Sequence, residues 1–397
     1  MTTPTHRLFD FLRAGAVTLL LAACGGGVET GGTGATGGSY VEGPITGFGS
    51  IIVAGVRFDD SSARVEDADG SGRSRDDLRL GMRVEVESGV ITDDGSGGRA
   101  ATATRVRFAS DLLGPVTAAD ASGALIAVLG QAVRVTAATV VDGVPGGAGA
   151  LAVGDIVEVH GFVEPGVLID RYVATRIERR SATPATFRVR GLVRELVVSP
   201  PSLRIGAQAF DLAATGVPAG LANGQFVRMT VATALVGGRW PVTAIAVDTR
   251  RVADRDEAEV EGLITSLTST TRFAVNGVDV DASSATFVDG SAGIVAGARV
   301  KVRGRSAGGT LIAATVDLRS DDDAFNEGVD LREAITDLNT GAQTFQVRGI
   351  TVFYGNGPEF RNGGVDDLAN GRRVRVRGLL SPDRTRAIAT RIEFENA

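Results

Sequence analysis

The chain has few of the residues that most often carry enzyme chemistry. It contains one cysteine and two histidines among 397 residues. One cysteine excludes an intrachain disulfide and a cysteine metal cluster, and two histidines leave no HExxH zinc motif and no redundant His-based triad. A GxxxxGK[ST] phosphate loop is absent, as is a GxSxG nucleophile motif in the part expected to fold. We therefore expect a protein that is not an enzyme and has no cofactor.

Aromatic residues are also scarce, and the chain has no excess of positive charge. Aromatic residues make up 5% of the chain, and the formal net charge is −6. Nucleic-acid binders neutralise phosphates with basic side chains, and stacking sites need aromatic rings, so we expect no nucleic-acid partner. Trp240 is the one candidate for an exposed aromatic anchor, although a core or strand-end position is the favoured interpretation. His160 is expected to face outward or to stand in a turn at a strand end.

Glycine is abundant, with 54 residues, and one pattern returns five times. The pattern is Leu-x-x-Gly-x-x-Val-x-Val, in which a turn leads into a strand with valines at alternate positions. Its glycines are separated by 73, 70, 73 and 74 residues, and they are Gly81, Gly154, Gly224, Gly297 and Gly371. A nearly fixed period indicates five copies of one small domain.

Each copy supplies five or six short strands with apolar residues at alternate positions and glycine-rich turns between them. A unit of about 70 residues with so many strands most naturally closes into a small barrel, because closure removes exposed strand edges. We therefore predict an all-β fold, a tandem array of about five small OB-like β-barrels. Cores of this size stabilise a domain only marginally, so neighbouring barrels are expected to pack against one another.

The predicted boundaries follow the repeated pattern. Residues 1–23 are expected to be a signal peptide, and residues 24–40 a lipidated cysteine with a glycine-rich tether. The five repeats are expected at residues 41–112, 113–181, 184–250, 257–319 and 331–397, with an acidic linker at 320–330. Repeat five, in which Ala334 replaces the opening glycine, is the most diverged copy.

The N-terminal segment predicts export and a lipid anchor. Arg7 and Arg13 precede an apolar run that is too short to span a bilayer as a mature helix. The run ends in Leu21-Ala22-Ala23-Cys24-Gly25, which resembles the lipobox of bacterial lipoproteins. That resemblance implies cleavage before Cys24, acylation of Cys24 by palmitate-type chains, and a place in the cell envelope. In a Gram-negative host, Gly25 after the cysteine implies the outer membrane, facing the periplasm or the surface. The alternative is an ordinary signal peptide that happens to contain a cysteine.

The repeats themselves resemble a known family. Three features carry the resemblance: the run Gly47-Phe48-Gly49-Ser50-Ile51 that continues to Phe58, the Leu-x-x-Gly-x-x-Val-x-Val strand, and a closing Ala-x-x-Ile. They resemble the bacterial domain-of-unknown-function family 5666, whose members look like tandem small β-units in exported proteins, often lipoproteins. The resemblance covers most of residues 41–397 and is strongest in repeats one and four. It implies no activity and no functional residues.

An acidic loop in repeat one is the best metal candidate. Its oxygen-bearing residues are Asp67, Asp69, Ser71, Asp76 and Asp77. Alternating oxygen ligands followed by glycine resemble the first half of a calcium loop. No helical pattern flanks the loop, and a solvated Asp/Gly turn is the favoured alternative.

Two strands carry basic residues at alternate positions, which period two places on one face of each strand. The residues are Arg299, Lys301 and Arg303 in repeat four and Arg373, Arg375 and Arg377 in repeat five. Such faces could recognise an anionic polymer or lipid headgroups. The alternative is cross-strand pairing with Asp317, Glu393 and Glu395.

These features favour a non-enzymatic, membrane-anchored envelope lipoprotein whose barrels act as a binding or spacer scaffold. A second hypothesis is an OB-like binder of a glycan or another anionic envelope polymer. A third is a hydrolase with an unidentified carboxylate site. The expected partners are the membrane, through acyl chains on Cys24, and an envelope polymer or protein.

Overall fold

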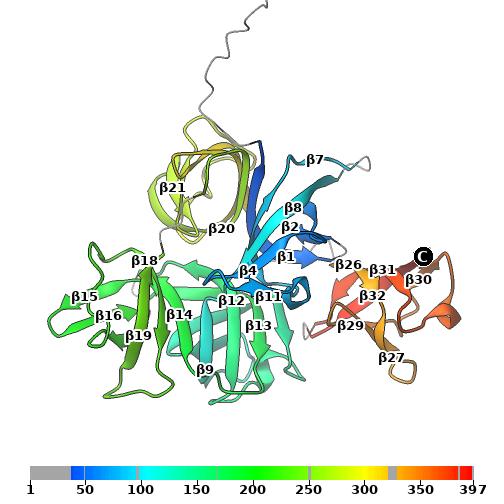
Figure 1. Ribbon diagram of the computed structural model, residues 1–397, viewed down its shortest axis with the longest axis horizontal. Coiled ribbons are helices and arrows are strands. Elements are labelled where there is room, and N and C mark those ends of the chain that lie inside the picture. The colour runs from blue at the N-terminus through cyan, green and yellow to red at the C-terminus, as the bar shows by residue number, and fades with distance from the viewer. Residues whose placement is uncertain are drawn as a thin grey trace, which may run out of the picture. The chain divides into compact units, whose positions relative to one another are not determined.

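The computed structural model describes residues 37–48, 50–94, 98–167, 169–248, 252–320, 329–382 and 385–395. In these residues the regular structure is β-strand, apart from three short 3₁₀ helices. The predicted signal peptide, Cys24 and most of the predicted tether and acidic linker lie outside them. The strands form five successive groups, called repeats one to five, which can be followed by colour along the chain (Figure 1). The prediction of an all-β array of small OB-like barrels is confirmed.

The elements are as follows. Repeat one contains β1 (Ser39–Gly47), β2 (Ile51–Val53), β3 (Val56–Asp59), β4 (Arg64–Asp67), β5 (Gly72–Arg73), η1 (Arg75–Asp77), β6 (Arg83–Ser88), β7 (Thr92–Asp93) and β8 (Arg99–Phe108). Repeat two contains β9 (Leu112–Ala119), β10 (Leu125–Val128), β11 (Gln131–Asp142), η2 (Ala148–Ala150), β12 (Ile156–Glu164) and β13 (Arg171–Arg179). Repeat three contains β14 (Phe187–Leu192), β15 (Arg194–Val198), β16 (Pro201–Ile205), β17 (Gln208–Asp211), β18 (Phe226–Val231) and β19 (Trp240–Val247). Repeat four contains β20 (Arg255–Ser269), β21 (Arg272–Val275), β22 (Val278–Asp281), β23 (Thr286–Phe287), β24 (Arg299–Ala307) and β25 (Thr310–Arg319). Repeat five contains β26 (Val329–Ala334), β27 (Thr336–Asn339), β28 (Thr344–Val347), β29 (Ile350–Phe353), β30 (Glu359–Arg361), η3 (Val365–Asp367), β31 (Arg373–Leu380) and β32 (Ala387–Phe394).

The strands of repeat one close into a barrel. β1 pairs antiparallel with β2 and with β6, β2 pairs with β3, and β3 and β4 run parallel to β8, which pairs antiparallel with β6. The order around the barrel is therefore first, second, third, fifth, fourth and back to first. This is the order of an OB fold, and the other four repeats have it too. In repeats three and five a one-residue break divides the first strand, into β14 with β15 and β26 with β27.

The repeated glycine is required by the backbone conformation of the turn before the fourth strand. All five copies have φ between 79° and 97°, a region that residues with a Cβ adopt only at a cost. The amide of Gly81 donates to the carbonyl of Ile45 in the first strand over 2.8 Å, and the glycine of every other repeat makes the same bond to its own first strand. The Leu-x-x-Gly turn thus sets the register between the fourth and first strands.

The glycine of the first strand leaves room for the hairpin turn between the second and third strands. A Cβ on Gly262 would lie 2.0 Å from the side chain of Asn276. Asn276 and the glycine after it have φ of 51° and 87°, the positive values that a two-residue type I′ hairpin needs. In repeat five Ala334 takes the place of the glycine, and the turn residue Arg348 lies over the ring of Phe48 in repeat one, 4.5 Å from its centroid.

The repeats are joined through their first strands. β1 runs parallel to β20 over four residue pairs and meets β26 at one, and β9 pairs antiparallel with β14. In the described part of the chain, every strand pairing between two repeats joins two first strands. Repeats one and five also share one apolar core and repeats two and three another, whereas the core of repeat four is largely its own. Packing between barrels, as expected from their small size, therefore supplements the cores of repeats one, two, three and five.

Candidate functional site

The predicted basic residues of repeat four lie on β24, where acids on the first strand of the same barrel bind them. Lys301 Nζ and Arg303 Nε each lie 3.1 Å from the carboxylate of Glu259. Arg299 lies 2.7 Å from Glu261 and is 6% exposed. Glu259 is fully buried, so its charge acts on the cations packed around it and not on solvent. The three cations are therefore held in ion pairs within the fold.

The basic residues of repeat five lie on β31, and two of them also pair with acids on the first strand of their own repeat. Arg373 lies 2.6 Å from Glu333, and Arg375 lies 2.6 Å from Asp330. Both acids are on β26, the first strand of the repeat. Arg377, two residues further along β31, is exposed. Two of these three cations are therefore engaged by the fold.

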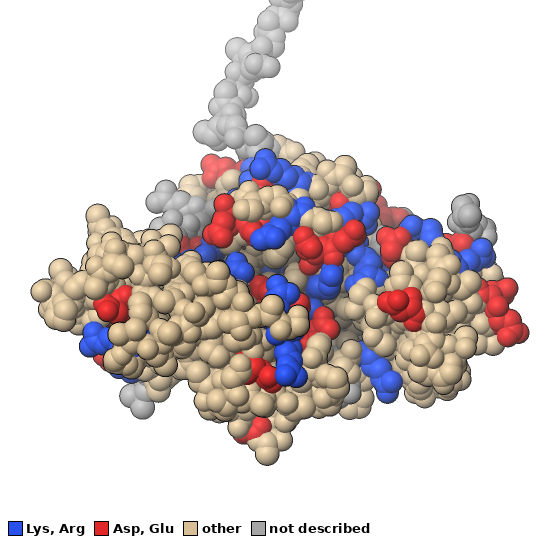
Figure 2. All heavy atoms as spheres, turned by 60° about the horizontal axis from the view of Figure 1, so that its bottom comes forward, with Lys and Arg blue, Asp and Glu red and all other residues tan. Residues whose placement is uncertain are grey.

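Pairing with acids was one of the two interpretations of these strands, but the closest acids are not those on the fifth strand. Glu395 lies 3.8 Å from Arg373, and Asp317 lies 3.6 Å from Arg319. The nearer partners come from the first strand in both repeats. On the face drawn in Figure 2, Lys and Arg side chains lie among Asp and Glu side chains and do not form a separate basic area.

Asp67, the first residue of the candidate calcium loop, organises a hairpin turn between β4 and β5. Its Oδ1 accepts hydrogen bonds from the amides of Asp69 and Ser71, both over 3.0 Å, and its Oδ2 lies 2.6 Å from Arg73. Burial would raise the pKa of Asp67, but Arg73 and the two amides outweigh burial and lower it. Both carboxylate oxygens of Asp67, the first residue of the candidate loop, are thus used by the turn itself.

Asp76 and Asp77, the other acids of this loop, lie in η1. The carboxylate of Asp77 accepts from the amide of Ser74 over 3.0 Å, and the hydroxyl of Ser74 accepts from the amide of Asp76, which makes a capping box. Nowhere among the described residues do three or more His, Cys, Asp and Glu side chains gather so that they could hold a metal ion.

Cys24, the predicted lipidation site, lies outside the described residues. Within the residues that are described, no helix is long and apolar enough to cross a bilayer.

Trp240 and His160 are both in the interior. Trp240 is 4% exposed and packs edge-on against Phe187, with ring centroids 5.7 Å apart, so the core position favoured for it is confirmed. His160 is 1% exposed in the middle of β12. The prediction that it faces outward or stands in a turn is wrong, because contacts with other repeats cover this face of β12.

A row of charged side chains is enclosed where the repeats meet. We call it the junction cluster, and it consists of Glu42, Arg83, Asp111, Arg190 and Asp248. Arg83 lies 3.0 Å from both Glu42 and Asp111, and Arg190 lies 3.3 Å from Asp111 and also pairs with Asp248. The first four residues are at most 4% exposed. The signs of charge alternate along the row, which is how buried charges offset their loss of hydration.

The junction cluster draws on four repeats. Repeat one supplies Glu42 from β1 and Arg83, which starts β6 directly after the repeated turn. Asp111 lies in the short connection between β8 and β9, and its second oxygen accepts from the amide of Gly161 in repeat two over 3.0 Å. Repeat three supplies the other two residues of the cluster. From repeat four, the side-chain amide of Asn276 donates to Glu42 over 3.3 Å. The cluster therefore acts as a shared polar core.

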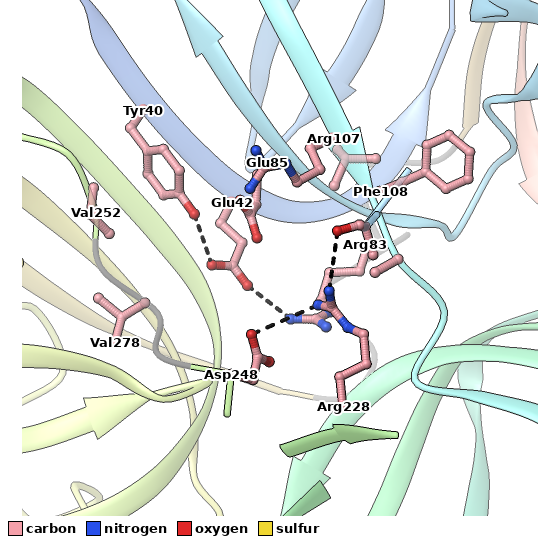
Figure 3. Close-up of a pocket in the computed structure, with 13 residues that line it drawn as sticks. Tyr40, Glu42, Arg83, Glu85, Arg107, Phe108, Arg228, Asp248, Val252 and Val278 are labelled. Atoms are coloured by element: carbon pink, nitrogen blue, oxygen red, sulfur yellow. Dashed lines mark hydrogen bonds and ion pairs between the residues drawn. The ribbon is translucent and has the colours of Figure 1, made fainter. Parts of the chain in front are cut away.

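A cavity of about 120 Å³ lies beside the cluster and is shown in Figure 3. Its walls carry three carboxylates and three guanidinium groups, those of Glu42, Glu85, Asp248, Arg83, Arg107 and Arg228. The hydroxyl of Tyr40 donates to Glu42 over 3.2 Å, and Arg228 lies 3.8 Å from Asp248. The equal number of opposite charges gives the cavity no net preference for an anion or a cation.

The ionisation of the buried acids follows from their partners. Burial would raise the pKa of Asp111, but Arg83, Arg190 and the amide of Gly161 outweigh burial and hold the pKa below 3.8. The pKa of Asp330, at the contact between repeats one and five, is lowered in the same way by Arg375 and Arg57. A general acid or base works best with a pKa near the operating pH. These carboxylates are instead kept ionised and paired, which suits a structural role.

Repeat one also contacts repeats four and five through ion pairs. Arg99 on β8 reaches across to β20 and lies 2.7 Å from both Glu257 and Glu259. Arg57 on β3 lies 3.2 Å from Asp330 on β26. These bonds flank the pairings of β1 with β20 and with β26.

The contact between repeats one and two depends on an arginine. Arg176 on β13 is fully buried and donates to the carbonyl of Leu80 over 3.2 Å. Leu80 belongs to the repeated turn of repeat one. With the junction cluster, these contacts join repeat one to each of the other four.

The acids of the first strand were missed because the sequence pattern indicates acidic partners after the fourth strand, at Asp317, Glu393 and Glu395. A detectable signal exists, since acids recur on the first strand opposite cations of the fourth strand in repeats one, four and five. Glu42 with Arg83, Glu259 with Arg303, and the acids of β26 with the arginines of β31 are its instances. Residues that pair between different repeats give no such periodic signal.

Comparison with known proteins finds one family model that matches parts of the chain. Residues 114–178, 261–317 and 334–393 match the model of a domain of unknown function, DUF5666. The matched regions fall in repeats two, four and five. The sequence predicts the strongest resemblance in repeats one and four and the greatest divergence in repeat five. The matched regions include repeat four, as predicted, but they also include repeat five and do not include repeat one.

No curated protein matches the chain. Among solved structures, one described as Drosophila Unr CSD456 is similar over 54% of this chain and 98% of its own, with 14% sequence identity and a TM-score of 0.14. The OB-like assignment rests on the strand order and not on this likeness. The three matched regions, together with the strand order that all five repeats share, are consistent with tandem DUF5666 domains.

Proposed function

We propose that this protein is a membrane-anchored, non-catalytic scaffold of the cell envelope, in which acyl chains on Cys24 hold the tandem barrels at the membrane. The observation that carries the scaffold role is the use of charge at the junctions. Repeat one is bound to repeats four and five by ion pairs that flank strand pairing, and the junction cluster joins repeats one to four. Such contacts favour one connected assembly of barrels over independent binding modules.

The hypothesis of an anionic-polymer binder is less well supported. It relied on basic faces in repeats four and five, and five of those six cations have acidic partners within the fold. A polymer would have to compete with carboxylates that are already in place. Arg377 is exposed and has no acidic partner among the described residues, so it would be the first contact for such a ligand.

The anchor is tested by replacing Cys24 with serine in the full-length chain. A serine hydroxyl cannot form the thioether that links diacylglycerol to a lipoprotein, so we expect Cys24→Ser to move from the membrane fraction to the soluble fraction. It should also lose incorporation of a labelled palmitate analogue. Thr30→Ser in the predicted tether is the matched control and should stay membrane-bound and labelled. A Cys24→Ser protein that remains in the membrane fraction would show that another segment holds it there.

The scaffold role is tested by crosslinking in intact cells with the wild-type chain and with Arg377→Gln. A scaffold predicts the same protein crosslinks for both. A polymer binder predicts recovery of glycan or another anionic polymer that falls with Arg377→Gln and with rising salt, since salt screens such contacts. That result would favour the polymer-binder hypothesis over the scaffold hypothesis, and it would leave the proposed membrane anchor unaffected.

A further inference from the structure

His160 is a buried titratable residue whose ring has no hydrogen-bond partner among the described residues. It lies in the middle of β12 and is 1% exposed. Neither Nδ1 nor Nε2 has a hydrogen-bond partner among the described residues. Buried polar atoms are nearly always bonded, and exceptions call for an explanation.

Charged groups face His160 from both sides of the contact between repeats one and two. Arg83 on β6 belongs to repeat one, Asp111 precedes β9, and Glu158 and Arg176 are on β12 and β13 of repeat two. Two acids and two arginines thus act electrostatically on the ring. A proton on the ring would be attracted by the acids and repelled by the arginines.

Both acids, Asp111 and Glu158, already pair with arginines. Asp111 is shared by Arg83, Arg190 and the amide of Gly161. Glu158 lies 2.9 Å from Arg180 and 3.9 Å from Arg188. Neither carboxylate can turn to an imidazolium without leaving an arginine, so a charged His160 has no ready partner in the closed contact.

The strands around His160 form the contact surface itself. The hydroxyl of Thr175 donates to the carbonyl of His160 over 3.1 Å, and the next residue, Arg176, donates to Leu80 of repeat one. A Cβ placed on Gly81 would lie 2.4 Å from the carbonyl oxygen of Thr175. The strand that binds His160 thus lies against the turn of repeat one with little space between them.

We propose that His160 is an acid-sensitive latch between repeats one and two, closed while the imidazole is neutral and opened when it takes up a proton. The chemical signal is the hydrogen ion alone. This inference does not depend on the membrane anchor or on the scaffold role.

The direction of the pH effect follows from linkage. Burial is the main reason that the pKa of His160 is lowered from its ordinary value of 6.5. The open form, with an ordinary histidine, therefore binds the proton more tightly than the closed form. The closed contact is fully stable above pH 6.5 and loses stability as pH falls below 6.5 toward the lowered pKa. Over that window, opening rises by up to about tenfold per pH unit.

The test is hydrogen exchange by mass spectrometry on the full chain at pH 7.5, 6.5 and 5.5, corrected for the intrinsic pH dependence of exchange. Peptides covering the repeated turn of repeat one and strands β12 and β13 should exchange up to about tenfold more readily at pH 5.5 than at 6.5. In His160→Gln, which is neutral throughout, this increase should vanish. Peptides of β28 and β29 in repeat five should show no increase in either protein.

Thr175→Val is the matched control, because it loosens the same contact without removing the titratable group. It should raise exchange at every pH and keep the increase below pH 6.5. The single histidine of the region after the predicted signal also permits a direct titration by NMR of a labelled imidazole, which is informative even if His160→Gln fails to fold. Equal exchange profiles for wild type and His160→Gln, or an imidazole midpoint at or above pH 6.5, would overturn the latch.

Discussion

Asp111 has partners in three repeats. Its carboxylate is shared by two arginines from repeats one and three and by a backbone amide of repeat two, and its backbone carbonyl accepts from the amide of Arg190 over 2.8 Å. The residue is fully buried. Its negative charge is therefore the point at which three repeats are held to one another.

Asp111→Asn should lower the free energy of unfolding by about 3–5 kcal/mol, because it leaves two arginines buried with one fewer counter-charge. Urea unfolding at pH 7 measures the change. Asp366→Asn, which alters an exposed aspartate in η3, is the control and should change stability by less than about 0.5 kcal/mol. If the two variants had the same stability, Asp111 would not be a structural centre.

The fourth strand of three repeats is bent by a β-bulge at a glycine. The register shifts immediately before Gly161, Gly304 and Gly378 in repeats two, four and five. A Cβ at these positions would lie 2.0–2.4 Å from a carbonyl oxygen of the fifth strand. The fourth and fifth strands approach too closely there for any side chain, and the bend helps a short strand to close the barrel.

Gly304→Ala should therefore destabilise repeat four, by about 1–3 kcal/mol as for other overpacking substitutions. The added Cβ would meet backbone, at 2.0 Å from the carbonyl oxygen of Ile312, so relief requires the strands to separate. Thermal unfolding followed by circular dichroism measures the loss. Gly72→Ala, where the added Cβ meets nothing within 4 Å, should melt close to wild type. A wild-type melting temperature for Gly304→Ala would refute the close approach.

At the scale of the whole molecule, repeat one is the common neighbour. It shares an apolar core with repeat five, pairs strands with repeats four and five, and meets repeats two and three at the junction cluster. Repeat four, by contrast, keeps its apolar core mostly to itself. Loss of one barrel should therefore affect the others unequally.

A chain that ends at residue 320 and so lacks repeat five should expose part of the core of repeat one. We expect hydrogen exchange of β2 and β3 to rise by at least about tenfold, the change that a loss of roughly 1.4 kcal/mol in local stability would give, while β21 and β22 of repeat four keep their protection. The contrast between the two pairs of strands within one sample is the internal control. Unchanged protection of β2 and β3 would mean that the shared core contributes little to repeat one.

The fold could be predicted from sequence much further than the site. Alternating valines and the repeated glycine specify strands and a turn locally, so they predicted the barrels without knowledge of any neighbour. The partners of Arg83 and Arg176 could not be predicted in this way, because they depend on which surfaces of different repeats meet. His160 shows the same limit: its strand pattern is that of an outward residue, and only the adjoining repeat makes it buried.

Joining through first strands has a consequence for copy number. Duplication of a gene segment can add further barrels to the sequence. To join the array as the present barrels do, each new barrel must also pair its first strand with the first strand of another repeat. β1 already receives β20 and β26, and β9 receives β14. A sixth copy joined in the same way would need an edge on one of these five first strands. The number of barrels in the array therefore depends on strand edges as well as on the length of the chain.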